Sequence, residues 1–274
     1  MVHARSVGVI LFRPPDRIGV FTQPVPESFQ LMARFDDYHR TVVGYHGTGL
    51  TGALRIINRV EGFRWSERDY DWLGRGIYFW EYAPKQALNF AKIRQRQYRK
   101  KKNKTPEESR RATEPLAVVA CMIRLGFCLD LTEPVNVEYL AEIFDSYKKS
   151  MELAGAALPK NTRKYRKLDC AVFEYAYKVI EDSEPNSKVD TARGIYIPTD
   201  GGKRVWDGSW ISRDTHIQLC VRNPGSLLGA WLHFPTGLGV NDVYEALQAG
   251  IAVVEPENSQ GEEDPQDNAE TQAD

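Results

Sequence analysis

The sequence predicts a mixed α+β fold, and three observations lead to this class. Short runs of β-branched, aromatic or other apolar residues between turn signals occur at residues 41–49, 73–81 and 216–221, as in strands. Longer segments with apolar residues at helical spacing, such as 83–102 and 137–155, lie between them. The two kinds of segment interleave without the regular βαβ alternation of a doubly wound sheet. With 274 residues, of which 42% are apolar, the chain can bury a sizeable core.

The first forty residues are expected to form an N-terminal strand and a covering loop. The run SVGVILF at residues 6–12 is typical of a strand. Four prolines follow within residues 13–27, and proline excludes a continuous helix because it lacks a backbone N–H and clashes with the preceding turn. Residues 1–40 therefore precede the main body, which we expect to span residues 41–240.

Within that body, the elements follow from local pattern. A strand at 41–49 leads into a short helix at 51–60 and a charged, aromatic loop at 61–72. A second strand at 73–81 leads into a helix at 83–102, with Pro84 in its first turn. The remaining predictions are strand material at 114–131, helices at 137–155 and 170–181, a glycine-rich turn at 199–210 after the segment RGIYIP, and a strand at 216–221.

The net charge of −1 conceals an uneven distribution. Residues 255–274 hold eight acids and no base, so the rest of the chain has 36 bases against 29 acids, a formal charge of +7. This acidic tail lacks aromatic and β-branched apolar residues, and we expect it to be disordered. Two basic segments, Lys92 to Lys104 and Lys160 to Lys167, are solvated surfaces in the simplest interpretation. With Tyr98 and Tyr165 they would also suit a nucleic acid.

Cysteine usage and hydropathy point to a reducing compartment. The four cysteines lie far apart and form no CxxC pair, which predicts reduced, buried thiols and no structural zinc. No apolar run approaches the ~18 residues that a membrane span needs. We therefore expect a cytoplasmic protein that makes no membrane contact.

Residues 47–52, GTGLTG, match the GxGxxG pattern of dinucleotide-binding folds. That fold requires a second buried strand after the helix, ending in an acid about twenty residues on. Here the corresponding segment, residues 61–72, is polar and loop-like. A Rossmann oxidoreductase is thus the weakest of the alternatives, and it predicts hydride transfer.

A different family fits two motifs together. YHGT at residues 45–48 is followed by a short apolar helix and Gly62-Phe63, and GIYF at residues 76–79 opens a strand that leads into a helix. His46 and Tyr78 are separated by about thirty residues. The chain resembles the ADP-ribosyltransferase superfamily, in its diphtheria-toxin-like H-Y-E branch of poly- and mono-ADP-ribosyltransferases. The resemblance covers residues 41–91 and 194–224.

The resemblance implies a split mixed or antiparallel sheet with peripheral helices, NAD⁺ as co-substrate and no metal. His46 would donate a hydrogen bond to an adenosine-ribose hydroxyl, and the Gly47 backbone would hold the nicotinamide carboxamide, with a further contact from the Thr48 hydroxyl. Tyr78 would stack on the nicotinamide ring. Phe90 would cover the opposite face of the ring, one residue later than in the closest family spacing.

The third motif departs from the family. IQLCVRNP at residues 217–224 places Gln218 where the family has its catalytic glutamate. Glutamine accepts a ribose hydrogen bond but cannot act as a base, so we expect single-unit transfer and not chain elongation. Asp214 and His216 lie close enough in sequence to supply a base. The preceding loop, residues 199–214, corresponds to the family's acceptor-recognition loop and contains Lys203, Arg204, Trp206, Trp210 and Arg213.

The sequence thus predicts a mono-ADP-ribosyltransferase that acts on a macromolecule, either a nucleic acid (RNA before DNA) or a protein. The resemblance further implies a toxin or phage-defence effector with an inhibitor or antitoxin partner. The alternative is a catalytically silent module that binds NAD⁺ or nucleic acid, in which Gln218 marks lost chemistry.

Overall fold

The computed structural model describes residues 6–10, 20–24, 38–162, 165–183, 188–197 and 204–233, with only the backbone at 6–10, 20–24, 38 and 39. The predicted acidic tail, residues 255–274, and the predicted recognition residue Lys203 lie outside these ranges. The basic segment Lys160 to Lys167 is described in part.

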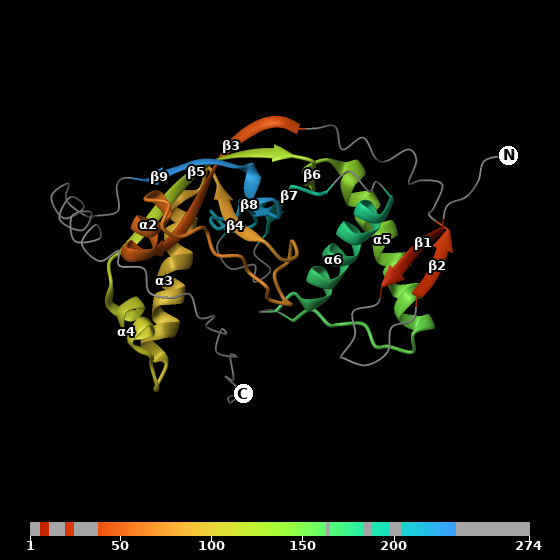
Figure 1. Cartoon of the computed structure of the whole chain (residues 1–274), viewed down its shortest axis with the longest axis horizontal. Helices are drawn as coiled ribbons and strands as arrows, with labels where there is room; N and C mark the ends of the chain where they lie inside the picture. Colours follow the sequence, from red (N-terminus) through yellow and green to blue (C-terminus); the bar gives the residue numbers. More distant parts are fainter. Residues whose placement is uncertain are drawn as a thin grey trace.

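The described residues form an α+β fold around a seven-stranded mixed sheet of order β6-β7-β8-β4-β3-β5-β9 (Figure 1). Every neighbouring pair is antiparallel except β6 and β7, which are parallel. The fold class is therefore as predicted. The strands are β3 (Tyr38–Gly49), β4 (Ile77–Glu81), β5 (Leu116–Gly126), β6 (Cys128–Asp130), β7 (Thr191–Tyr196), β8 (His216–Val221) and β9 (Leu227–Leu232).

The helices follow the predicted segments, with one addition. They are α2 (Leu50–Ile57), α3 (Pro84–Lys100), α4 (Pro106–Thr113), α5 (Pro134–Leu153) and α6 (Lys167–Ser183). Helix α4 is not predicted from the sequence, because its residues are mostly polar and carry no apolar stripe. The helix is instead begun by a capping box, in which Thr105 and Glu108 bond each other's backbone N–H groups.

The N-terminal prediction was only half right. β1 (Ser6–Ile10) is the expected strand, but β2 (Val20–Pro24) pairs with it antiparallel where a covering loop was predicted. Prolines argue against a helix, yet a strand still tolerates one at its end or on an edge. Pro24 ends β2 and pairs with Ser6, the first residue of β1.

Helices α3 and α6 lie on the same side of the sheet, with β4 between them (Figure 1). Ala87 of α3 packs with Trp80 and Val118 of the sheet. On the other flank, Tyr177 of α6 packs with Ala192 and Cys220. Since Cys220 pairs directly with Tyr78 of β4, and Trp80 lies two residues on, both helices border one strip of β4 and β8.

The opposite face of the sheet holds a second core of Ile77, Phe79, Leu219, Val221 and Ile123. Phe63, from the loop after α2, packs against it. At the end of this face, the buried Arg193 guanidinium bonds Glu81 at 2.6 and 2.8 Å and Asp130 at 3.0 and 3.2 Å. Because each charge is paired, this cluster fixes β4, β6 and β7 relative to one another.

The structure also bears on the cysteine and membrane predictions. All four cysteines are free and buried, as expected, and burial raises the pKa of the Cys128 thiol to about 12. Among the described residues, no set of three or more His, Cys, Asp or Glu side chains is arranged to hold a metal ion. Nor does any helix in those ranges combine the length and apolarity that crossing a membrane requires.

Candidate active site

The candidate site lies where β3 and β4 separate. Their last paired residues are Tyr45 and Trp80. Beyond that point β3 continues to pair with β5 as far as Gly49, so β3 and β4 diverge where His46 and Gly47 come level with Phe79 and Tyr78. The ring of His46 bridges the opening, with Nδ1 at 2.9 Å from the Tyr78 carbonyl oxygen. Two of the predicted site residues therefore meet at the split.

The partner of His46 fixes its tautomer. A carbonyl oxygen only accepts, so Nδ1 carries the hydrogen and donates it to Tyr78. Burial lowers the pKa of His46, which keeps the imidazole neutral and leaves Nε2 as an acceptor. The predicted role of His46 as a donor to a ribose hydroxyl is therefore reversed: the hydroxyl would donate to Nε2.

Gly47 presents its backbone to the split. Tyr82 donates its N–H to the Val43 carbonyl, whereas Leu50 donates to Pro115 at the entrance to β5. Because backbone groups alternate along a strand, Gly47 shares the direction of Val43 and directs its N–H and C=O toward β4. At that level the two strands form no ladder pair. This donor and acceptor suit a primary carboxamide, which offers one acceptor and two donors.

Gly47 also has a packing role. A Cβ at this position would lie 1.9 Å from the Ala87 carbonyl oxygen and 3.2 Å from the Ala91 Cβ. The backbone of α3 thus approaches β3 directly over the split, and only glycine permits that approach.

Tyr78 is held by its hydroxyl group. It donates to the Gly74 carbonyl at 2.7 Å and accepts the Leu73 N–H at 3.1 Å. Burial raises the pKa of Tyr78 well above its usual value, so the phenol stays protonated. The ring is fixed on the face of β4 that α3 and α6 border, which is consistent with a stacking role.

Gln218 lies on the same face. It pairs with Trp80 across the β4–β8 ladder, next to the Tyr78–Cys220 pair, so it is the diagonal neighbour of Tyr78. Its Oε1 accepts the Trp72 Nε1–H at 2.5 Å, and its Nε2 donates to His216 Nε2 at 3.0 Å. Both ends of the amide are engaged, and its orientation follows because an indole nitrogen can only donate.

His216 does not have a lone pair available for proton transfer. Its Nδ1 donates to the Asp214 carbonyl at 2.6 Å, while Nε2 accepts from both Trp80 Nε1, at 3.1 Å, and Gln218. Burial lowers its pKa. The sequence-based suggestion that His216 supplies a base is therefore wrong for this arrangement, in which the imidazole orients Gln218 and Trp80.

These two histidines predict a pH dependence of stability. Burial lowers the pKa of His46 and of His216 below 6.5, so the unfolded chain takes up protons first as pH falls. The free energy of unfolding then rises with pH in the range between the histidine pKa values of the folded chain and those of the unfolded chain. Urea unfolding at about pH 7.5 and about pH 5.5 should show lower stability at the acid pH. Between these two pH values the His216→Gln variant should lose less stability than the wild type. An equal loss of stability would contradict the conclusion that burial lowers the pKa of His216.

Phe90 borders the sheet face that holds Tyr78 and Gln218, whereas Thr48 lies on the opposite face. The Phe90 ring packs on Trp80 with centroids 4.9 Å apart, so it borders the face that holds Tyr78 and Gln218. No contact between Phe90 and Tyr78 is observed among the described side chains. Thr48 alternates with Gly47 along β3 and so shares the opposite face with His46, whose ring packs against Phe63 and Phe79.

The described part of the predicted recognition loop, residues 204–214, leads directly into β8. Arg204 forms an isolated bridge with Ser212, and Val205 donates its N–H to Ile211. Trp206 is 61% exposed and Trp210 is 94% exposed, while Arg204 and Arg213 are also exposed. The loop therefore presents two indoles and two guanidinium groups to solvent beside the site.

Three site residues escaped the sequence analysis: Trp72, Trp80 and Tyr196. Tyr196 stacks on His216 with centroids 4.9 Å apart, and Trp72 bonds Gln218. Gly194 permits this, because a Cβ there would lie 2.8 Å from the Trp72 ring. The YDWLG segment offered a signal in its aromatic residues, but nothing in sequence linked Trp72 to a residue 146 positions away.

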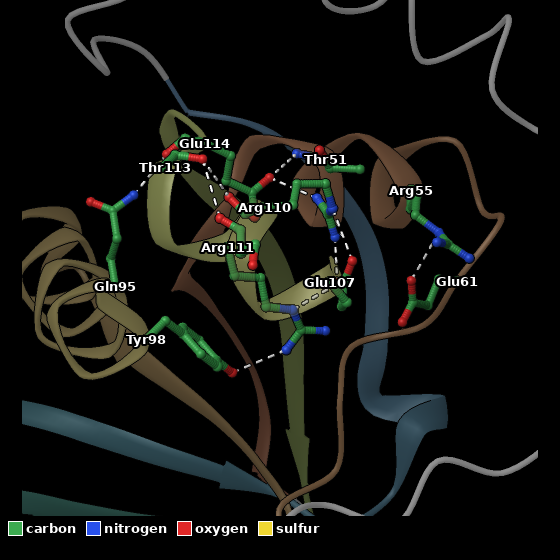
Figure 2. Close-up of polar contacts among 11 residues, drawn as sticks. Thr51, Arg55, Glu61, Gln95, Tyr98, Glu107, Arg110, Arg111, Thr113 and Glu114 are labelled. Carbon is green, nitrogen blue, oxygen red and sulfur yellow. Dashed lines mark hydrogen bonds and ion pairs between the residues drawn. The ribbon is translucent and has the colours of Figure 1, made fainter. Parts of the chain in front are cut away.

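The GTGLTG segment does not form a Rossmann-type dinucleotide site. Both sheet neighbours of β3 are antiparallel to it, whereas a Rossmann unit needs parallel strands. The first turn of α2 is also occupied by a carboxylate: Glu114 Oε2 accepts the Thr51 N–H at 3.1 Å and an Arg110 hydrogen at 2.9 Å (Figure 2). A pyrophosphate would be repelled there.

Comparison of the chain with protein-family models, with curated proteins and with solved structures gives no match.

Proposed function

We propose that the protein is a NAD⁺-dependent mono-ADP-ribosyltransferase with its reaction centre at the β3–β4 split. The observation that carries this is the Gly47 backbone, which faces the split at the level of Tyr78 where the ladder has ended. A carboxamide bound there would place its ring beside the fixed Tyr78 phenol. The split sheet and helix placement are consistent with the ADP-ribosyltransferase fold that the motifs resemble.

The residues suit cleavage of a nicotinamide N-glycosidic bond. Stacking on Tyr78 and the Gly47 contacts hold the leaving group while the bond from ribose C1′ to nicotinamide N1 lengthens. Nicotinamide leaves with the bonding electron pair, an acceptor lone pair forms the new bond to C1′, and the acceptor loses its proton to solvent. An adenosine-ribose hydroxyl that donates to His46 Nε2 would position that end of NAD⁺, and a hydroxyl of the nicotinamide ribose within reach of Gln218 would orient the reacting sugar.

Gln218 favours transfer of one unit. Its amide carries no charge to stabilise the developing oxocarbenium ion, and its two ends are bonded to Trp72 and His216. It therefore acts by position. Activation of an ADP-ribose hydroxyl for chain elongation would need a base that this amide does not provide.

The transfer can be tested by incubating the full chain with biotin-labelled NAD⁺ and a cell lysate. Portions of the labelled product are then treated with ribonuclease, deoxyribonuclease or protease. We expect macromolecular label that one of these treatments removes. Label in free ADP-ribose alone would reduce the activity to NAD⁺ hydrolysis, and intact NAD⁺ would contradict the function.

Gln218 variants give a second test. Gln218→Ala should lower nicotinamide release roughly tenfold, since one hydrogen bond is worth about 1–1.5 kcal/mol. Gln218→Glu should retain or raise it, because a carboxylate still accepts from Trp72 and adds charge beside the sugar. Initial rates measured by nicotinamide chromatography decide this. If Gln218→Ala releases nicotinamide at the wild-type rate, Gln218 does not orient the sugar.

Both ends of the Gln218 amide are already hydrogen-bonded within the protein. This observation favours a second candidate, a catalytically silent module that binds NAD⁺ or nucleic acid. That module would bind NAD⁺, measured by calorimetry, and release no nicotinamide in the presence of lysate. The cytoplasmic location, the toxin or phage-defence role and the antitoxin partner stay predictions from the resemblance.

A further inference from the structure

A stripe of basic side chains runs along the outer face of α3. Ala87 and Ala91 bury the inner face of this helix against the sheet. On the opposite face Lys85, Lys92, Arg96 and Lys100 follow one another at helical spacing, and all four are exposed. Residues 84–100 contain six bases and no acid, so this face carries one sign of charge over its whole length.

The four residues of this stripe keep their charge available. The acids of the neighbouring α4 are used by other partners: Glu108 pairs with Lys101, and Glu107 pairs with Arg110 and Arg111. Across the described ranges, no carboxylate forms an ion pair with any member of the stripe.

This stripe differs from the basic run predicted from sequence. Tyr98 was expected to offer a stacking surface, but Arg94 and Arg111 lie over its ring at 5.6 and 5.8 Å from the centroid. The two guanidinium groups also donate to its hydroxyl, at 3.4 and 3.1 Å. Tyr98 therefore joins α3 to α4 and is not available to a ligand.

The stripe borders the candidate active site. Phe90 and Ile93, 37% and 52% exposed, lie along one edge of it, and Phe90 packs on Trp80. Trp80 in turn donates to His216, two residues before Gln218. From β8, the chain leads back to the exposed Trp206 and Trp210 with Arg204 and Arg213. Cations thus lie on α3, whose Phe90 contacts Trp80 of the site, and indoles with cations lie in the loop that leads into β8.

We propose that this surface binds a single-stranded nucleic acid, with its phosphates along the α3 stripe and its bases stacked on Trp206 and Trp210. Lysine and arginine at regular spacing neutralise a phosphate backbone, and exposed indoles stack on bases of any sequence. That this strand is the acceptor of ADP-ribose rests on the proposed function. The binding itself does not.

A single strand fits better than the other polyanions. Stacking on an exposed indole needs unstacked bases, which a duplex does not offer. An anionic membrane would require a broad apolar helix face turned outward, whereas Ala87 and Ala91 of α3 are buried and only Phe90 and Ile93 expose large apolar side chains on this helix.

The test measures fluorescence anisotropy of the full chain with a labelled, mixed-sequence single-stranded RNA of about 20 nucleotides, the matching DNA strand and the RNA duplex, at several salt concentrations. The variant Lys92→Gln/Arg96→Gln/Lys100→Gln should bind either single strand on the order of tenfold more weakly. For this variant, the slope of log affinity against log salt concentration should be shallower by about 2, because each of the three lost phosphate contacts removes ~0.7 from the slope. Trp210→Ala should weaken binding about 5- to 100-fold.

The control Lys148→Gln/Lys149→Gln/Lys188→Gln removes the same charge from three exposed lysines, two in α5 and one just before β7. α5 lies at the other end of the molecule from α3 (Figure 1). It should bind as the wild type does. Three results would each overturn the proposal. They are equal binding by the α3 variant and this control, tighter binding to the duplex than to the single strand, and binding to anionic vesicles but not to RNA. Nicotinamide release is followed in parallel: strand binding without it refutes the transferase, and release without strand binding refutes only the nucleic-acid surface.

Discussion

Replacing Gly47 by alanine is expected to lower the free energy of unfolding by about 3 kcal/mol, at the upper end of ordinary overpacking, and to abolish nicotinamide release. The new methyl group would lie 1.9 Å from the Ala87 carbonyl oxygen and 2.6 Å from its carbon. Both atoms belong to helical backbone, so no side-chain rotation relieves the overlap. α3 must move away from β3, and the split that Gly47 lines changes shape.

The matched control is Gly62→Ala, since a Cβ at Gly62 meets no atom within 4 Å. This variant should stay within about 0.5 kcal/mol of the wild type, as surface substitutions do. Urea unfolding followed by circular dichroism measures both. Equal stability of the two variants would show that α3 does not approach β3 as closely as described.

Replacing Tyr78 by alanine is expected to reduce nicotinamide release at least 100-fold, roughly the cost of a misplaced reacting group. Alanine removes the ring proposed to stack on nicotinamide and the hydroxyl bonds to Leu73 and Gly74. Tyr78→Phe keeps the ring and loses only those bonds, so it should stay within about tenfold of the wild type.

Because Tyr78→Ala also opens a cavity, which costs about 3–5 kcal/mol, it needs a control for stability. Tyr147→Ala truncates a buried tyrosine of α5 in the same core cluster without touching the split. Steady-state rates below the unfolding temperature of both variants separate the two effects. If Tyr147→Ala loses as much activity as Tyr78→Ala, the loss reflects stability and not stacking.

Local pattern in the sequence predicts much of the fold. The run HIQLCV is β8 residue for residue, because β-branched and apolar residues between turn signals have few alternatives. α4 and β2 were not predicted, because a capping box stabilises α4 and strand pairing stabilises β2, and neither depends on an apolar stripe. Strand order and register depend on long-range pairing that periodicity does not encode.

The site was predictable only in part, for the same reason. His46, Gly47 and Tyr78 are found from their motifs, and the structure brings them together at one split. The hydrogen bond of Trp72 to Gln218, the occupied lone pair of His216 and the contact of Gly47 with α3 all depend on residues distant in sequence. The tautomer of His46 likewise follows only from its contact with the Tyr78 carbonyl.

We propose that NAD⁺ is held with its nicotinamide at the β3–β4 split and is cleaved there. The most direct test is a time course of nicotinamide release by the wild-type chain and by Tyr78→Ala and Tyr78→Phe, with NAD⁺ and lysate. We predict release by the wild type and by Tyr78→Phe, with ADP-ribose recovered on a macromolecule, and almost none by Tyr78→Ala. Undiminished release by Tyr78→Ala, or NAD⁺ that stays intact or is reduced, would contradict the claim.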